Sequence, residues 1–119
     1  MSAEPSLPGS LQEKLARLQR SQQIIAQLIA QRQRVEAELQ EVTSAIEELE
    51  KLPDDAEVFK VVGPLLIRTS KEEALKSLKE RKEELELHHS ILVKQEKKER
   101  DTMAALQREI QEELPRTGS

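Results

Sequence analysis

Apolar residues recur along most of this chain in alternating steps of three and four, which is the heptad pattern of a coiled-coil helix. The pattern covers residues 10–52 and 70–114, with one interruption between them. It predicts a mainly α fold in which two long helices pack against each other. Residues 1–9 and 115–119 contain prolines and glycines outside the pattern. They are therefore predicted to be a flexible leader and a flexible tail of a single domain spanning 1–119.

Both helices carry a sequence signal for their first turn. Ser10 is followed three residues later by Glu13, and Ser70 is followed at the same spacing by Glu73. A Ser with a Glu three positions on is a capping box, in which each side chain bonds the other residue's backbone N–H. The helices are therefore expected to begin at Ser10 and Ser70, and Pro115 is expected to end the second helix.

The heptad pattern of the first helix divides into two frames. One frame consists of Leu11, Leu15, Leu18, Ile25 and Ile29, with Gln22 at a polar core position. The other consists of Leu28, Val35, Leu39, Val42, Ile46 and Leu49, with Arg32 at a polar core position. The frames differ by three residues. An offset of three overwinds a coiled coil locally, so a change of packing is expected near Leu28 and Ile29.

The second helix keeps one frame, although polar residues interrupt it. Its predicted core positions are Leu75, Leu78, Lys82, Leu85, His89, Leu92, Glu96, Glu99, Met103, Leu106, Ile110 and Glu113. With a chain reversal between the helices they should pack antiparallel, which brings Arg32 within a turn of Glu96. Buried polar groups set register at a cost in stability. We therefore expect firm packing near the chain reversal and looser packing in the other half.

The interruption, residues 53–69, is predicted to be a β-hairpin. Val58-Phe-Lys-Val-Val62 and Leu65-Leu-Ile-Arg-Thr69 are rich in β-branched and apolar residues, and Gly63-Pro64 separates them. Both faces of each strand are apolar, and an isolated hairpin leaves two edges unpaired. We expect hairpins of several subunits to join into a shared sheet or barrel through Val58, Phe59, Val61, Val62, Leu65, Leu66 and Ile67.

Composition and charge exclude several classes of function. The chain has one Phe, no Trp, no Tyr and no Cys, and 35% of its residues are charged. Acidic and basic residues are nearly balanced in each helix, so there is no basic surface for nucleic acid or for a membrane. No apolar stretch has the length of a membrane span or a signal core. A soluble, cytoplasmic protein is expected, and the lack of cysteine fits a reducing compartment.

No pattern in the chain indicates an enzyme, a cofactor or a metal site. His88 and His89 are adjacent on a helix and so diverge, unlike chelating positions four apart. The Glu83-Glu84 and Glu112-Glu113 pairs are ordinary surface carboxylates in the absence of a pocket. A basic run at Lys94, Lys97, Lys98 and Arg100 alternates with acidic residues and is typical of ion pairs that support a helix.

The sequence resembles the β class of the prefoldin family. The resemblance rests on Leu52-Pro-Asp-Asp-Ala56, followed by Val58-Phe-Lys-Val-Val-Gly-Pro-Leu-Leu-Ile-Arg68, between two heptad helices, and it extends from about Leu11 to Leu114. It implies one hairpin per subunit and a hetero-hexamer of two α and four β subunits on a double β-barrel. It also implies an ATP-independent chaperone that holds unfolded polypeptides and passes them to a group II chaperonin, with an archaeal origin preferred.

In such an assembly the client would bind where the two helices end. The residues that this resemblance places at these ends, called the tip residues below, are Leu11, Leu15, Leu18, Leu106, Ile110 and Leu114. They are also heptad residues, so each could simply pack against the other helix. The alternative function is a coiled-coil adaptor or tether whose apolar core is purely structural. The doubly apolar hairpin favours the chaperone, because a tether has no need of an assembly element.

Overall fold

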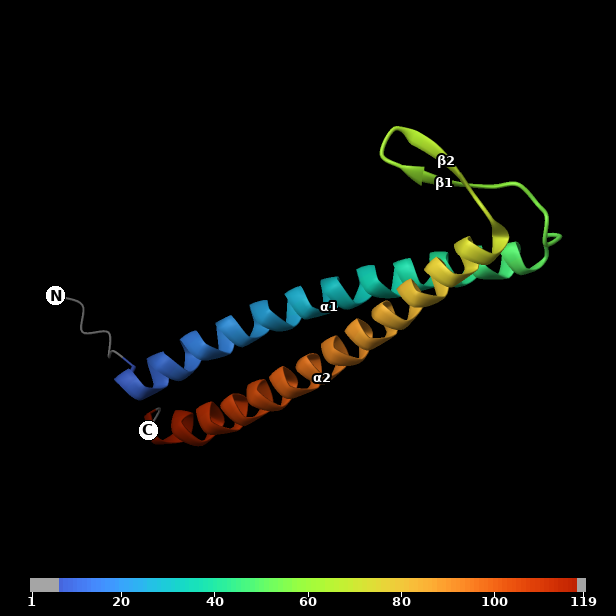
Figure 1. Cartoon of the computed structure of the whole chain (residues 1–119). Coiled ribbons are helices and arrows are strands. Elements are labelled where there is room, and N and C mark those ends of the chain that lie inside the picture. The colour runs from blue at the N-terminus through green and yellow to red at the C-terminus, as the bar shows by residue number, and fades with distance from the viewer. Residues whose placement is uncertain (1–6, 118–119) are drawn as a thin grey trace. The chain divides into compact units, whose positions relative to one another are not determined.

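The computed structural model describes residues 7–117, and side chains as far as residue 114. Its elements follow the order α1 (Gly9–Glu50), β1 (Val58–Val62), β2 (Leu65–Thr69) and α2 (Lys71–Thr117) (Figure 1). The chain divides into two compact units. The terminal unit contains the described residues up to Gln31 and from Leu92 onward, and the hairpin unit contains Arg32–Ile91. The expected pair of long helices joined by one hairpin is confirmed.

The two helices begin differently. Ser70 caps α2 as expected: its hydroxyl oxygen accepts a hydrogen bond of 3.1 Å from the backbone N–H of Glu73. The reciprocal half of the predicted capping box differs, because the Glu73 carboxylate accepts from the Thr69 hydroxyl at 3.2 Å instead of from the backbone N–H of Ser70. In α1 the first turn closes instead on Pro8, whose carbonyl accepts from the N–H of Gln12 at 3.0 Å. Ser10 therefore lies inside the helix, and its assignment as the cap is wrong.

The helix ends also depart from the predicted bounds. Helix α1 ends at Glu50, two residues before Leu52, and α2 continues through Pro115 to Thr117. Proline lacks the N–H that would bond the carbonyl four residues back. At Pro115 the loss concerns one carbonyl, that of Gln111. Gln111 is exposed in the last turns of α2, so water can bond this carbonyl as it bonds the final carbonyls of a helix. The prediction that α2 stops at Leu114 is therefore wrong.

The hairpin forms with the predicted strands and turn. β1 and β2 pair antiparallel, with Val58 opposite Thr69 and Val62 opposite Leu65. This register leaves Gly63 and Pro64 as a two-residue turn. Gly63 has a φ of 56°, in the left-handed region that glycine enters without a Cβ clash. A glycine at the first turn position suits the tight hairpin turns whose twist matches that of the strands.

Burial along α1 follows a single heptad frame. Every core position of this frame is buried or half-buried: Leu11, Lys14, Leu18, Ser21, Ile25, Leu28, Arg32, Val35, Leu39, Val42, Ile46 and Leu49. Gln22, the residue expected at a core position, is exposed, and the neighbouring Ser21 is buried. The predicted change of frame near Leu28 and Ile29 is therefore wrong. The two apparent frames arose because Leu15 and Ile29 are half-buried apolar residues beside the true core positions.

The core positions predicted for α2 are confirmed, since all twelve are buried or half-buried. Within each unit the two helices are antiparallel. In the hairpin unit, Glu50 contacts Lys79 and Glu36 contacts His89. In the terminal unit, Lys14 contacts Glu113, whereas Ser21, further along α1, contacts Glu99, further back along α2. Whether one unit packs more firmly than the other stays a prediction.

Candidate functional site

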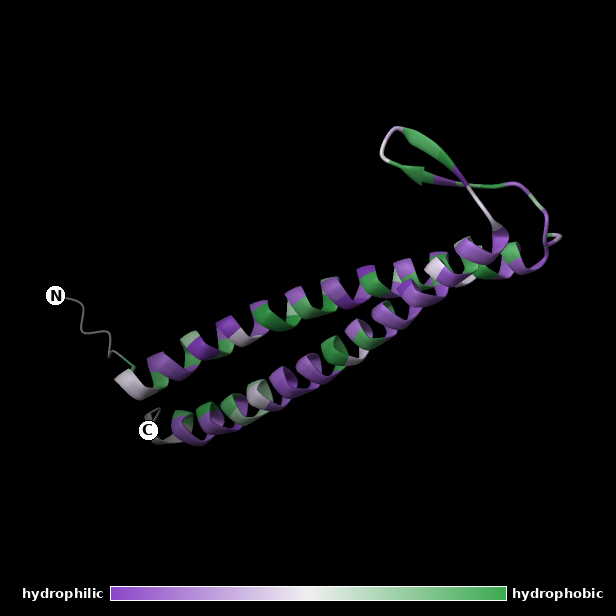
Figure 2. Ribbon diagram, in the orientation of Figure 1, coloured by the Kyte–Doolittle hydropathy of each residue, from purple (hydrophilic) through white to green (hydrophobic). Residues whose placement is uncertain are grey.

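The hairpin exposes apolar side chains on both of its faces. Val61 and Leu66 are opposite each other in the strand register, and both are about three-quarters exposed. Phe59, Val62, Leu65 and Ile67 are exposed as well, while Val58 is half-buried. Figure 2 shows the same apolar character along both strands. A contiguous apolar surface of this kind on a folded chain marks an interaction site.

A groove with a volume of about 420 Å³ adjoins the hairpin inside the hairpin unit. Its apolar walls come from Leu49 of α1, Val58 and Phe59 of β1, and Leu78 of α2. Small side chains, Ala45 and Ala74, lie on the helical side and leave the space open. The apolar surface of the hairpin therefore continues into the helices beneath it.

Lys71 connects the beginning of α2 to the end of α1. Its ammonium group donates to the Leu52 carbonyl at 2.7 Å and to the Glu50 carbonyl at 3.4 Å, and it lies 3.4 Å from the Asp54 carboxylate. The last carbonyls of a helix lack intrahelical partners and attract a cation. Sequence reasoning missed this contact, because the lysine becomes a cap of α1 only once the hairpin has brought the chain back.

The tip residues lie mostly inside the terminal unit rather than on its surface. Leu11 is 0% exposed, and Leu106 and Ile110 are also buried. Leu15 and Leu18 are half-buried, and Leu114 is 47% exposed. The structure thus places these residues at the ends of α1 and α2, but it shows them with most of their apolar surface covered.

Two polar contacts join α1 and α2 at core positions of the terminal unit. Lys14 donates to the Glu113 carboxylate and lies 3.9 Å from Glu109. The hydrogen bond to Glu113 raises the pKa of Lys14 above its usual value. Nearer the middle of the helices, the Ser21 hydroxyl, only 2% exposed, donates to Glu99 at 2.7 Å.

Lys14 and Ser21 were missed as core residues, although the sequence held a signal for them. Stepping back from Ile25 by four, three and four residues leads to Ser21, Leu18 and Lys14.

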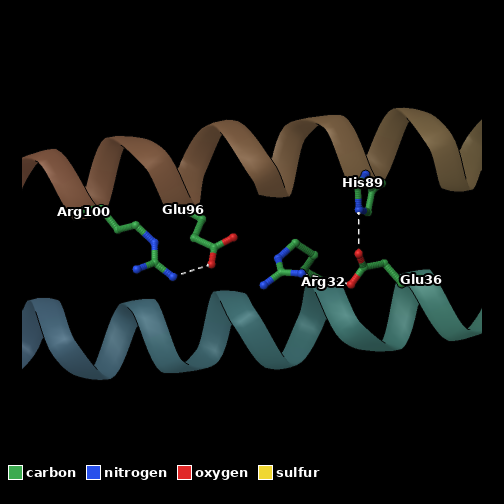
Figure 3. A network of polar contacts seen from close by, with 5 residues as sticks. All are labelled: Arg32, Glu36, His89, Glu96 and Arg100. Atoms are coloured by element: carbon green, nitrogen blue, oxygen red, sulfur yellow. Dashed lines mark hydrogen bonds and ion pairs between the residues drawn. The ribbon is translucent and has the colours of Figure 1, made fainter.

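In the hairpin unit the polar contacts between helices lie nearer the surface. Figure 3 shows His89 of α2 pointing to Glu36 of α1, with 3.3 Å between Nε2 and the carboxylate oxygen. Arg81 makes two bonds to Glu38, at 2.7 and 3.0 Å. These bonds hold the pKa of the Glu38 carboxyl below its usual value, mainly through the side-chain hydrogen bond to Arg81.

The basic run of α2 forms the expected ion pairs along the helix. Lys97 pairs with Asp101 at 3.1 Å, and Arg100 pairs with Glu96 at 3.0 Å, the second of which is drawn in Figure 3. Both pairs are four residues apart, the spacing that stabilises a helix. Among residues 7–117, no group of three or more potential metal ligands comes together, and neither described helix is long and apolar enough to cross a membrane.

The arrangement of two long helices around one hairpin is also found in known proteins. The family model described as prefoldin subunit matches residues 12–116. The chain belongs to the prefoldin family. Among its prefoldin relatives, the β subunit of Pyrobaculum calidifontis is 44% identical over 91% of this chain and 86% of its own length. The β subunit of Pyrococcus abyssi is 42% identical over 92% of this chain and 93% of its own length.

A solved prefoldin structure has the same fold. The crystal structure of the prefoldin β subunit from Thermococcus strain KS-1 matches with a TM-score of 0.85 at 39% identity, over 93% of this chain and 97% of that chain. The relatives are archaeal β subunits, as the sequence resemblance implied. Prefoldin subunits are chaperones rather than enzymes, and the family assembles into oligomeric complexes.

Proposed function

We propose that this chain is the β-type subunit of an ATP-independent chaperone that captures non-native polypeptides at its helix ends. The assembly is a hetero-hexamer with two α-class and four β subunits, joined through a β-barrel platform of hairpins. It acts in the cytoplasm and transfers its clients to a group II chaperonin. Neither step requires a cofactor or nucleotide.

The observation that carries the proposal is the exposed hairpin. Phe59, Val61 and Leu66 are each at least half exposed, and they lie on a two-stranded sheet whose outer edges meet no other strand among residues 7–117. Hairpins of other subunits can pair with these edges and cover the apolar faces, which removes both from water. The groove beside Phe59 offers further apolar surface to the same partner. Assembly brings several pairs of helix ends together on one particle, so many weak client contacts act jointly.

Client capture follows from the apolar residues at the helix ends, provided that these ends separate. Leu106 and Ile110 are buried in the closed terminal unit. Exposing one such side chain costs about 1.5 to 3 kcal/mol, and covering it again with an unfolded chain returns a similar amount. The free energy lost on exposing the side chains is therefore nearly equal to the free energy gained on binding the client, so binding can be reversed without ATP.

The same burial also favours the second candidate function, a coiled-coil tether. In a tether, Leu11, Leu106 and Ile110 would stay packed at all times and would touch no client. The two functions differ in what the assembled protein does to an unfolded protein in solution.

An aggregation assay separates the two functions. The chain is assembled with an α-class archaeal partner and mixed at stoichiometric ratio with a chemically denatured protein whose aggregation is followed by light scattering. The chaperone function predicts suppressed scattering. A Leu15→Ser, Leu106→Ser double variant should assemble normally and suppress less. Unchanged scattering with the complete wild-type assembly would support the tether instead.

A further inference from the structure

Part of the apolar core near the end of the terminal unit lies between two polar contacts, while Leu11, 0% exposed, lies beyond the outer one. Lys14–Glu113 lies on one side and Ser21–Glu99 on the other, and both join α1 to α2. Between these contacts along the two helices lie Leu15, Leu18, Met103, Leu106 and Ile110, all buried or half-buried. Beyond Ser21–Glu99, away from the helix ends, the apolar core resumes at Ile25 and Leu92, which are both buried.

The Ser21–Glu99 contact therefore interrupts the apolar core of the terminal unit. Ser21 is 2% exposed, and one helical turn before Glu99 the carboxylate of Glu96 is also buried and bonds Arg100. Burying a hydroxyl or a carboxylate group adds little stability to a helix pair. When the pair opens, water replaces the lost hydrogen bonds of these groups. Separation of the helix ends thus has a natural stopping point here, because the next step would expose Ile25 and Leu92. Segments with separate apolar clusters open as separate cooperative units.

We propose that the Ser21–Glu99 hydrogen bond is the inner boundary of the client-binding site. In this view residues 11–20 of α1 and 100–114 of α2 open as one unit, exposing Leu18, Leu106 and Ile110, while Ile25 and Leu92 stay packed. The inference rests on the proposed function for the client, whereas the extent of opening is inferred from the positions of Ser21, Glu99 and Ile25 in the terminal unit. The client is an apolar segment of an unfolded polypeptide chain. Its apparent affinity is limited by the fraction of molecules in which the helix ends are open.

A quantitative relation follows from this coupling. If a client binds only the open end, its apparent dissociation constant equals the intrinsic one divided by the open fraction. Helical segments of about 10 to 15 residues are marginal in water without packing, so the separated ends lose their intrahelical bonds and amide hydrogen exchange of the same residues reports the open fraction. A substitution at the boundary must therefore change exchange protection and the apparent dissociation constant by the same factor.

The test uses the full chain assembled with an α-class partner and three variants. Ser21→Leu combined with Glu99→Leu replaces the polar contact by an apolar one and should raise the protection of amides 11–20 and 103–114 by about tenfold or more, the factor expected for burial of one leucine side chain. Ser21→Asp sets a second carboxylate against Glu99 and should lower the protection of the same amides. Lys82→Leu, at a half-buried core position of the hairpin unit, is the control and should leave these amides unchanged.

Binding is measured on the same assemblies with fluorescently labelled lactalbumin that has been reduced and carboxymethylated, so that it remains unfolded. The proposal expects weaker binding for the double leucine variant, tighter binding for Ser21→Asp and unchanged binding for Lys82→Leu, each by the factor seen in exchange. Circular dichroism and exchange in the hairpin unit show whether each variant is folded.

Several results would overturn the inference. If amides near Ile25 and Leu92 exchange together with those of the helix ends, Ser21–Glu99 is no boundary. If protection changes but lactalbumin binding does not, the boundary does not limit the binding site, although the chaperone function survives. If the wild-type assembly binds no lactalbumin, the proposed function fails, while the exchange data still decide whether the helix ends open to Ser21–Glu99.

Discussion

Shortening Leu66 to alanine should weaken subunit assembly by an amount that follows from its exposure. Leu66 is 72% exposed in the single chain. Full burial of a leucine side chain stabilises by about 1.5 to 3 kcal/mol, so burying the exposed part in an assembly contributes about 1 to 2 kcal/mol. Most of that contribution is lost with alanine. The dissociation constant should rise about 5- to 30-fold for each β subunit contact, since 1.4 kcal/mol corresponds to a factor of ten.

The chain offers a matched control on α2. Leu87 is 64% exposed but lies away from the hairpin, so Leu87→Ala makes the same chemical change outside the assembly surface. A surface change of this kind alters a free energy by no more than about 0.5 kcal/mol, or about twofold in a dissociation constant. Each variant is mixed with the α-class partner, and sedimentation velocity over a dilution series gives the concentration at which the complex dissociates. Far-ultraviolet circular dichroism confirms equal helix content.

Two results would refute this reasoning. One is that Leu66→Ala and Leu87→Ala dissociate at the same concentration, in which case the hairpin does not form the assembly surface. The other is that Leu66→Asp, which adds a charge at the same place, assembles as well as wild type. Burial of an unpaired carboxylate is far more costly than loss of apolar contact, so this variant should be the weaker of the two.

Three further predictions concern the single chain, studied at fixed concentration by urea denaturation. Leu85→Ala should lower the free energy of unfolding by about 2 to 5 kcal/mol, because Leu85 is 3% exposed, while Leu87→Ala should cost less than about 0.5 kcal/mol. Ser70→Ala removes the bond to the N–H of Glu73 and should cost about 0.5 to 2 kcal/mol. The bonds from Arg81 lower the pKa of Glu38, so this pair stabilises above about pH 4.3 and its contribution is lost as the pH falls through the lowered value. Glu38→Gln should therefore lose less stability than wild type between pH 5 and about pH 3, and salt should reduce the difference because both side chains are exposed.

Much of the fold could be read from local patterns in the chain. The heptad steps of α2, the cap at Ser70 and the turn at Gly63 were all recognised correctly, since each depends on residues a few positions apart. The hairpin was also recognised from its two apolar strands, and its exposure in the single chain agrees with the expected need for partners. Predictions were wrong where two neighbouring residues could make the same local contact. At the start of α1, the Pro8 carbonyl closes the first turn in place of the Ser10 hydroxyl.

The sequence by itself determined the two helices, the hairpin between them and the apolar residues on both faces of its strands, because helix and strand periodicities are properties of a short segment. Tertiary structure alone decided which polar side chains of the two helices meet. The heptad step back from Ile25 marks Ser21 as a core position, but only the position of α2 determines that Ser21 meets Glu99 while Gln22 is exposed to water. In the same way, Lys71 caps α1 only because the hairpin returns the chain to that point. Such contacts join residues far apart in sequence, and their partners are set by the packing of whole helices.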